Sequence, residues 1–172
     1  MSKRKDRAAR IRKDNNMTEA TVRLGAPFTG EVLYHYTCVE HLPSIFNNGY
    51  LKLTCSDLIA PDGTLETELR CAAFKPVVWL TDSLSPKHMG LDGSAYDKKA
   101  IRITVVKKDY MKRWSTWEPL KLMNRRWRDA YCQNMNWLSW YVAEEKITFT
   151  DILKIENCNN GTVYYESGRI VA

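Results

Sequence analysis

The sequence lacks the ligand patterns on which most metal sites and nucleotide sites depend. It has only three histidines, and its five cysteines are scattered without a C-x-x-C pair, so neither an H-E-x-x-H helix nor a Cys/His ligand set can form. It also contains no G-x-x-x-x-G-K-[ST] and no G-x-G-x-x-G, which excludes a P-loop and a Rossmann site at the level of motif. Metal catalysis is not expected. An odd number of separated cysteines is typical of a reduced, cytoplasmic protein.

Long apolar runs are also missing. No segment approaches the roughly 18 consecutive apolar residues of a membrane span, and no apolar core follows the basic start of the chain as it would in a secretory signal. The 172 residues, 44% of them hydrophobic, are enough for one domain with a real core and too few for two. We expect a single domain over residues 17–172, with no membrane partner.

Positive charge is concentrated in residues 1–16. Seven lysines and arginines stand there against two aspartates, which leaves the rest of the chain nearly neutral although the whole carries +6. Such an arm can bind a phosphate backbone or an acidic protein surface without sequence specificity. The alternative is a solvated, disordered leader, or an extension upstream of a second start at Met17.

Short apolar or alternating segments predict a series of strands. They cover residues 31–37, 50–54, 77–81, 100–106, 137–143, 151–158 and 162–168. The last two strands are joined by Asn159-Asn160-Gly161, which is a strong hairpin signal.

Two helical regions are expected. Thr37 and Glu40 form a capping-box pattern before a short helix that Gly49 would end. Pro43 lies inside this pattern, so either the first turn is irregular or the helix starts later. A longer helical region is expected over residues 107–134, with an interruption near its middle.

A histidine stands at the end of the first predicted strand, in the run L-Y-H-Y-T-C-V-E-H over residues 33–41. Side chains alternate along a strand, so His35 and Thr37 share one face and Tyr36 lies on the other. The run resembles the first motif of the ADP-ribosyltransferase superfamily, above all the H-aromatic-T opening of DarT-like toxins. The resemblance implies that His35 binds the ribose of NAD, with Tyr36 and Thr37 beside it. The alternative is a core or surface histidine next to an ordinary helix.

A second run, V-V-W-L-T-D-S over residues 77–83, resembles the central strand that lines the nicotinamide pocket in the same superfamily. Trp79 and Thr81 would face one side of this strand and supply a stacking surface and a hydroxyl. Tyr96, in the loop that follows, is a second candidate ring for nicotinamide. The alternative is that the run is merely a buried strand and Tyr96 a partly exposed packing residue.

The third motif of these enzymes is a glutamate on a late strand, where it favours the oxocarbenium-like transition state as nicotinamide leaves. The resemblance puts this role on Glu144; Glu145 would lie on the other face of the same strand. A different alignment, anchored on residues 146–147 and Ile152, puts Trp140 at the place of the glutamate. That departure would fit a domain that keeps the nucleotide-binding fold and has lost or changed the chemistry.

Tryptophans and basic residues are interleaved between positions 112 and 140. This mixture of stacking rings and phosphate-pairing cations suits single-stranded nucleic acid or a nucleotide base. Trp127 and Tyr131, four residues apart, are equally typical of a buried helix face. A nucleophilic Cys38 or Cys132 with His35 as its base is a further formal alternative, although isolated cysteines are usually small core residues. The interleaved residues are Trp114, Trp117, Trp127, Trp137 and Trp140 with Lys112, Arg113, Lys121, Arg125, Arg126 and Arg128.

Together, the motifs predict an α+β domain resembling ADP-ribosyltransferases, with a split antiparallel sheet and helices around an NAD-sized cleft. The implied function is NAD-dependent transfer of ADP-ribose to a nucleic acid or protein, with NAD as the substrate and with His35 and Glu144 in catalysis. The alternative is a noncatalytic module that binds a nucleotide or a host protein, as a phage-encoded inhibitor would. Trp140 favours the alternative, and the intact H-Y-T run favours the enzyme.

Overall fold

The structure is a computed structural model that describes residues 30–54, 76–92, 95–118, 129, 132 and 135–171. The chain divides into the units Met1–Gly30 and Glu31–Ala172, and every element named below belongs to the second unit. The predicted arm at 1–16 lies outside the described residues. So does most of the Trp/Arg-rich stretch beyond residue 118.

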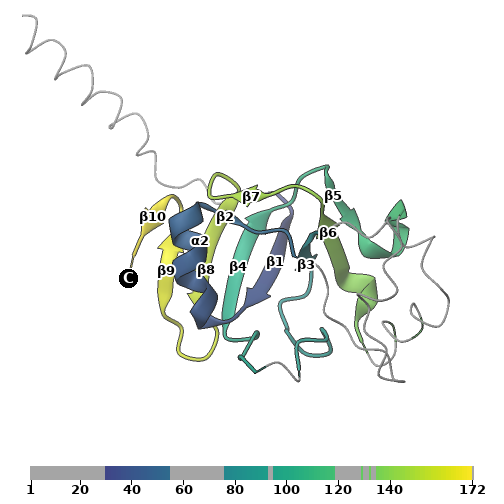
Figure 1. The fold of residues 1–172 in the computed structure, drawn as a ribbon, viewed down its shortest axis with the longest axis horizontal. Coiled ribbons are helices and arrows are strands. Elements are labelled where there is room, and N and C mark those ends of the chain that lie inside the picture. The colour runs from purple at the N-terminus through teal and green to yellow at the C-terminus, as the bar shows by residue number, and fades with distance from the viewer. Residues whose placement is uncertain are drawn as a thin grey trace, which may run out of the picture. The chain divides into compact units, whose positions relative to one another are not determined.

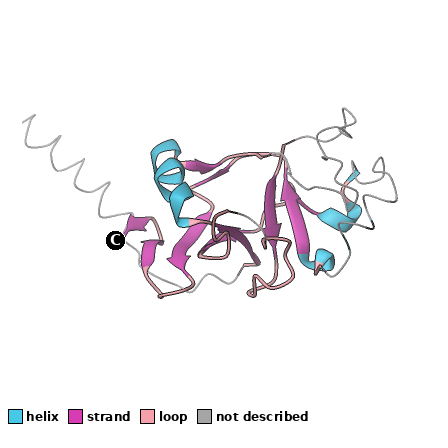
Figure 2. Cartoon of the chain, turned by 60° about the horizontal axis from the view of Figure 1, so that its bottom comes forward, coloured by secondary structure: helices cyan, strands magenta, loops and turns pink. Residues whose placement is uncertain are grey.

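The described residues form ten strands and a few short helices (Figures 1 and 2). The strands are β1 (Val32–Thr37), β2 (Tyr50–Leu51), β3 (Val78–Thr81), β4 (Ile101–Val106), β5 (Met111–Arg113), β6 (Trp140–Ala143), β7 (Ile147–Thr148), β8 (Ile152–Asn157), β9 (Val163–Glu166) and β10 (Arg169–Ile170). The helices are the 3₁₀ turns η1 (Val39–His41), η3 (Trp114–Thr116) and η5 (Trp137–Ser139) and the α-helix α2 (Leu42–Asn48).

Eight strands form one antiparallel sheet in the order β10-β9-β8-β4-β1-β3-β6-β5, and β2 pairs with β7 in a second, small sheet. β1 and β4 pair over their full lengths, whereas β1 and β3 share the single pair Tyr34↔Thr81. The large sheet is therefore weakly joined in the middle, between β1 and β3. The predicted antiparallel sheet is confirmed. The described part is mostly β, and its longest helical segment is η1 with α2.

The segment after β1 shows why the helix starts late. Pro43 occupies the first turn of α2, where its missing N–H costs no hydrogen bond, and η1 fills the space before it. The predicted capping box is not formed, because no side chain caps either helix and the Thr37 hydroxyl instead hydrogen-bonds His41 Nδ1 at 2.8 Å. Gly49 ends α2 with φ +75°, a conformation that glycine adopts without strain.

One face of the sheet carries the main core. The odd-numbered residues of β4 point into it and are fully buried, together with Leu33 of β1 and Ile155 of β8. α2 covers this face through Leu42 and Ile45, as its position across the sheet in Figure 1 shows. The clean alternation of β4 is the pattern that the sequence predicts for a strand with one buried face.

The opposite face carries a second cluster, which we call the tryptophan cluster: Val77, Trp114, Trp117, Trp140 and Val142, with Trp79 packed against it. The prediction of a helix over residues 107–134 is wrong for residues 111–116, and residues 119–134 lie mostly outside the described residues. Residues 111–113 form β5, because they pair with residues 141–143 of β6, and 114–116 form only a 3₁₀ turn that buries Trp114. Residues 137–139 are likewise a 3₁₀ turn rather than the start of a strand.

Candidate functional site

His35 lies at the weak joint of the sheet. Its Nδ1–H donates to the backbone carbonyl oxygen of Trp79 at 2.8 Å, so the imidazole links β1 to β3 where the ladder provides only one residue pair. A carbonyl only accepts, which places the proton on Nδ1 and leaves Nε2 as an acceptor in the neutral ring. Burial lowers the pKa of His35, against the opposing effect of its hydrogen bond to Trp79, so the ring is neutral at pH 7. Part of the side chain keeps access to solvent.

The two residues that follow His35 are held by the fold itself. Tyr36 is 8% exposed and donates its hydroxyl to the carbonyl of Leu84 at 2.6 Å. Burial raises the pKa of Tyr36, and the neighbouring Arg102 acts in the opposite direction. Thr37 is buried, and its hydroxyl is engaged with His41. The sequence predicts that both residues lie beside a bound nucleotide. In the structure, the hydrogen bonds of both side chains fix the end of β1.

The second motif also contributes mainly to packing. Thr81 is 1% exposed; its hydroxyl donates to Ser139 Oγ at 3.0 Å and accepts the Ser83 N–H at 3.0 Å. Trp79 is partly exposed and packs edge-to-face on Trp140, with ring centroids 5.7 Å apart. Tyr96 stands more than half exposed in its loop, which leaves it the most accessible of the predicted rings.

Glu144 lies beyond the end of β6, because the strand stops at Ala143 and residues 144–145 form a bend. Its carboxylate accepts the Trp117 indole N–H at 2.8 Å. Trp117 belongs to the tryptophan cluster, so Glu144 is tied to the face of the sheet that carries that cluster. The expectation that Glu144 and Glu145 lie on opposite faces of one strand is wrong, because β6 ends at Ala143.

The predicted catalytic pair is not brought together. Tyr34 and Thr81 are directly paired and share a face, so Trp79 lies on that same face while His35 points to the other. The structure gathers Trp79, Trp140 and Glu144 around the tryptophan cluster, and it leaves His35 on the face of the main core. Among the described residues, the hydrogen bond from His35 to the Trp79 backbone links the two groups.

Trp140 is a packing residue. It is 5% exposed and lies edge-to-face on both Trp79 and Trp114, and its buried indole N–H makes no hydrogen bond within the described residues. At the position where one alignment expects a glutamate, this chain therefore has a large apolar ring that helps to hold β3 against β6.

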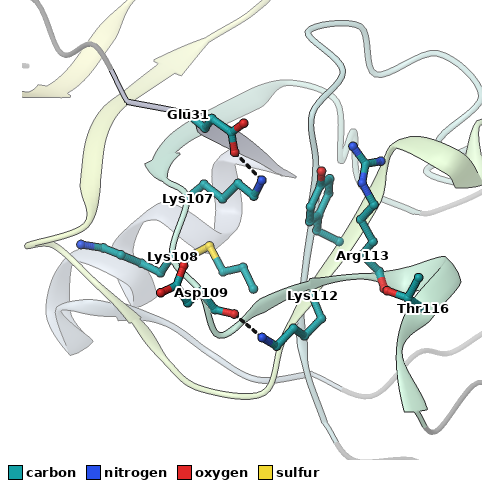
Figure 3. A pocket seen from close by; sticks show the side chains of 9 residues that line it. Glu31, Lys107, Lys108, Asp109, Lys112, Arg113 and Thr116 are labelled. Atoms are coloured by element: carbon teal, nitrogen blue, oxygen red, sulfur yellow. Dashed lines mark hydrogen bonds and ion pairs between the residues drawn. The ribbon is translucent and has the colours of Figure 1, made fainter.

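Sequence reasoning missed a basic pocket of about 330 Å³ beside β5 (Figure 3). The signal was present as K-K-D-Y-M-K-R over residues 107–113, which the helix prediction concealed. The pocket is lined by Glu31, Lys107, Lys108, Asp109, Met111, Lys112, Arg113, Thr116 and Tyr141.

Comparison of the chain with protein-family models, with curated proteins and with solved structures finds no match. Within the described residues, no group of three or more His, Cys, Asp or Glu side chains is placed to hold a metal ion. No helix in the described ranges is long and apolar enough to cross a membrane. Any functional assignment therefore depends on the motifs and on the way the sheet arranges them.

Proposed function

We propose that this protein is an ADP-ribosyltransferase-like domain that binds NAD, or a related nucleotide, at the joint between β1 and β3. The observation that carries the proposal is the setting of His35. Its ring is fixed by the bond to the Trp79 carbonyl, it is neutral, and its Nε2 is an acceptor suited to a ribose hydroxyl. The single residue pair at this joint supports the proposal that the split sheet implied by the resemblance opens between β1 and β3.

The order of the strands supports the same proposal. The three motifs lie more than 40 residues apart from one to the next, yet β1, β3 and β6 are consecutive neighbours in the sheet. A chain that merely contained three chance likenesses would have no reason to place them side by side. His35 lies on the other face of the sheet from Trp79 and Glu144, so this order supports the likeness of the fold and not one site shared by all three motifs.

Binding is tested with His35→Asn. The asparagine amide can still donate to the Trp79 carbonyl from nearly the position of Nδ1, but it has nothing at the position of Nε2. Isothermal titration calorimetry with NAD should show binding to the wild type and a loss of about tenfold or more for the variant, as for removal of a central ligand contact. His88→Asn is the matched control, because His88 is exposed in a loop with a positive φ that asparagine tolerates. Equal affinities of wild type and His35→Asn would overturn the proposal.

Binding without chemistry is the form of this function that the side chains favour. Glu144 is held by Trp117 on the face opposite to His35, and the tryptophan at position 140 is buried in packing. The domain then acts as a nucleotide- or protein-binding module, for example as an inhibitor of a host system. Its macromolecular partner would be the protein or nucleic acid that it sequesters.

Transfer of ADP-ribose from NAD to a nucleic acid or protein is the second candidate function. It is favoured by the place of Glu144 at the end of β6, the strand next to β3. Incubation with labelled NAD and cell extract separates the two candidates. Label that transfers with the wild type and Glu145→Gln, but falls about 100-fold with Glu144→Gln, supports the transferase, because a carboxylate that acts in the transition state affects turnover more than binding. NAD binding without transfer of label supports the module.

A further inference from the structure

The basic pocket in Figure 3 is lined by Lys107 and Arg113, and Tyr141 lies between β3 and β5 on β6 at its wall. Arg113 of β5 is paired with Tyr141 of β6, and its guanidinium lies 4.8 Å from the centre of the tyrosine ring. The Lys107 ammonium lies 5.5 Å from the centre of the same ring. Two cations are thus held against one aromatic side chain, which stabilises each of them but brings their like charges close together.

Tyr141 contributes a hydroxyl to the pocket. Its side chain is 3% exposed and lines the pocket, and its hydroxyl makes no hydrogen bond within the described part of the chain. A phenol hydroxyl that lines a pocket can donate a hydrogen bond to a ligand there. A ligand that accepts a hydrogen bond would satisfy it.

The cations around Tyr141 are only partly neutralised. Lys112 donates to the backbone carbonyl of Asp109 and pairs with no carboxylate among the described residues. Arg113 donates to a carbonyl oxygen at 2.9 Å and reaches Asp82 only at 3.4 Å, in a pair that is about half exposed and therefore weak. Lys107 is paired with Glu31, whose side chain is 76% exposed. The pocket thus offers several N–H donors, a phenol and an excess of positive charge.

We propose that this pocket binds phosphate, with Tyr141, Lys107, Lys112 and Arg113 as its ligands, and that it receives the phosphate groups of a free nucleotide or of a nucleic acid strand. Lys107, Lys112 and Arg113 all line the pocket, and a guanidinium with two ammonium groups matches the charge and the acceptor oxygens of a phosphate. The volume of about 330 Å³ is at the lower end for small-ligand sites and suits a diphosphate rather than a whole nucleotide. The proposal does not depend on nucleotide binding at His35.

Glu31 gives the proposal a distinctive signature. Its carboxylate already pairs with the Lys107 ammonium, so a phosphate that binds Lys107 must displace this carboxylate. The hydrogen bond from Lys107 lowers the pKa of Glu31, which keeps this competing charge in place at neutral pH. Removing the charge of Glu31 should therefore strengthen phosphate binding, whereas removing a cation should weaken it.

The test is calorimetric titration of the full chain with inorganic pyrophosphate. Lys112→Gln should weaken binding about fivefold, and Tyr141→Phe about tenfold, because the latter loses a hydrogen bond to a charged oxygen while the ring and its two cations stay. Glu31→Gln should tighten binding about threefold. Lys52→Gln is the control, since Lys52 is an exposed lysine outside the pocket and its loss changes the net charge equally.

The outcomes separate the proposal from its rivals. Absence of pyrophosphate binding to the wild type would overturn it, and so would equal effects of Lys112→Gln and Lys52→Gln, which would mean general charge attraction. Retention of binding by His35→Asn is expected, and it makes failure here distinguishable from failure at the nucleotide site. A parallel titration with a ten-residue oligothymidine identifies the source: the same ranking of variants indicates a nucleic acid strand, and no binding of the oligonucleotide indicates a free nucleotide. Circular dichroism melts confirm that each variant is folded.

Discussion

Replacements of His35 should separate the contribution of its hydrogen bond to Trp79 from that of its neutral imidazole ring. His35→Ala removes the hydrogen bond to Trp79, leaves that carbonyl without its partner and removes a largely enclosed ring. A lost hydrogen bond costs about 1 kcal/mol, and the stranded carbonyl and lost burial add about 2 kcal/mol more. His35→Asn keeps a donor for the carbonyl and should cost only about 1 kcal/mol. We therefore expect His35→Ala to be about 2 kcal/mol less stable than His35→Asn in urea unfolding at pH 7.5.

The pH dependence of the same variants tests the neutral imidazole. Burial lowers the pKa of His35 in the folded state below its ordinary value of 6.5, so on acidification the unfolded chain takes up this proton first. The stability contributed by the neutral ring is fully present above about pH 6.5. It is lost as the pH falls from there toward the folded-state pKa, by up to about 1.4 kcal/mol per pH unit.

The assay compares the free energy of unfolding of the wild type with that of His35→Asn between pH 7.5 and pH 5.5. Other titrating groups are common to both proteins and cancel in the difference. The wild type should lose its advantage over the variant below about pH 6.5. A constant difference across this range would refute the enclosed neutral ring, and equal stability of His35→Ala and His35→Asn would refute the link between β1 and β3.

Three further substitutions test the packing around the site by urea unfolding. Ile103→Val, at a fully buried position of β4, should cost about 1 kcal/mol, and a cost near zero would mean that the core is not packed there. Gly49→Ala should cost about 1 kcal/mol because φ is +75°, whereas Gly49→Asn should cost less; a neutral Gly49→Ala would contradict the left-handed end of α2. Glu144→Gln keeps an acceptor for the Trp117 indole and should change stability by less than about 1 kcal/mol, whereas Trp117→Phe removes the indole N–H and part of a buried ring and should cost more; the reverse order would contradict their hydrogen bond.

Local signals in the sequence were enough to find several elements. β4 alternates between buried and partly exposed residues, and one apolar face is all that such a pattern needs. Asn157 to Thr162 form the predicted hairpin turn between β8 and β9, in which Gly161 has φ +74°. Gly49 ends the helix as expected. In each case the information lies within a few neighbouring residues.

The errors arose where distant pairing decides the conformation. Residues 111–113 form a strand because β6 supplies hydrogen-bond partners about 30 residues away, and nothing local marks them as extended. The basic pocket was missed for the same reason, since Tyr141 and Lys107 come together only when β4, β1, β3 and β6 have been placed in order. Strand order cannot be obtained from the period of one segment.

The register of β3 and β6 shows where the two candidate residues for the third motif, Glu144 and Trp140, lie relative to His35. On β3, the side chains of Val78 and Leu80 point to the face of His35, whereas that of Trp79 points to the other face. Their partners on β6, Ala143 and Tyr141, therefore share the face of His35. Neither is a carboxylate. Trp140 and Glu144 both belong with the tryptophan cluster, so moving the alignment from one to the other does not put a negative charge beside His35. If the ribose of NAD binds at His35, an oxocarbenium-like cation formed there would gain little stabilisation from residue 140 or residue 144. This is the physical reason why we rank noncatalytic binding above transfer of ADP-ribose.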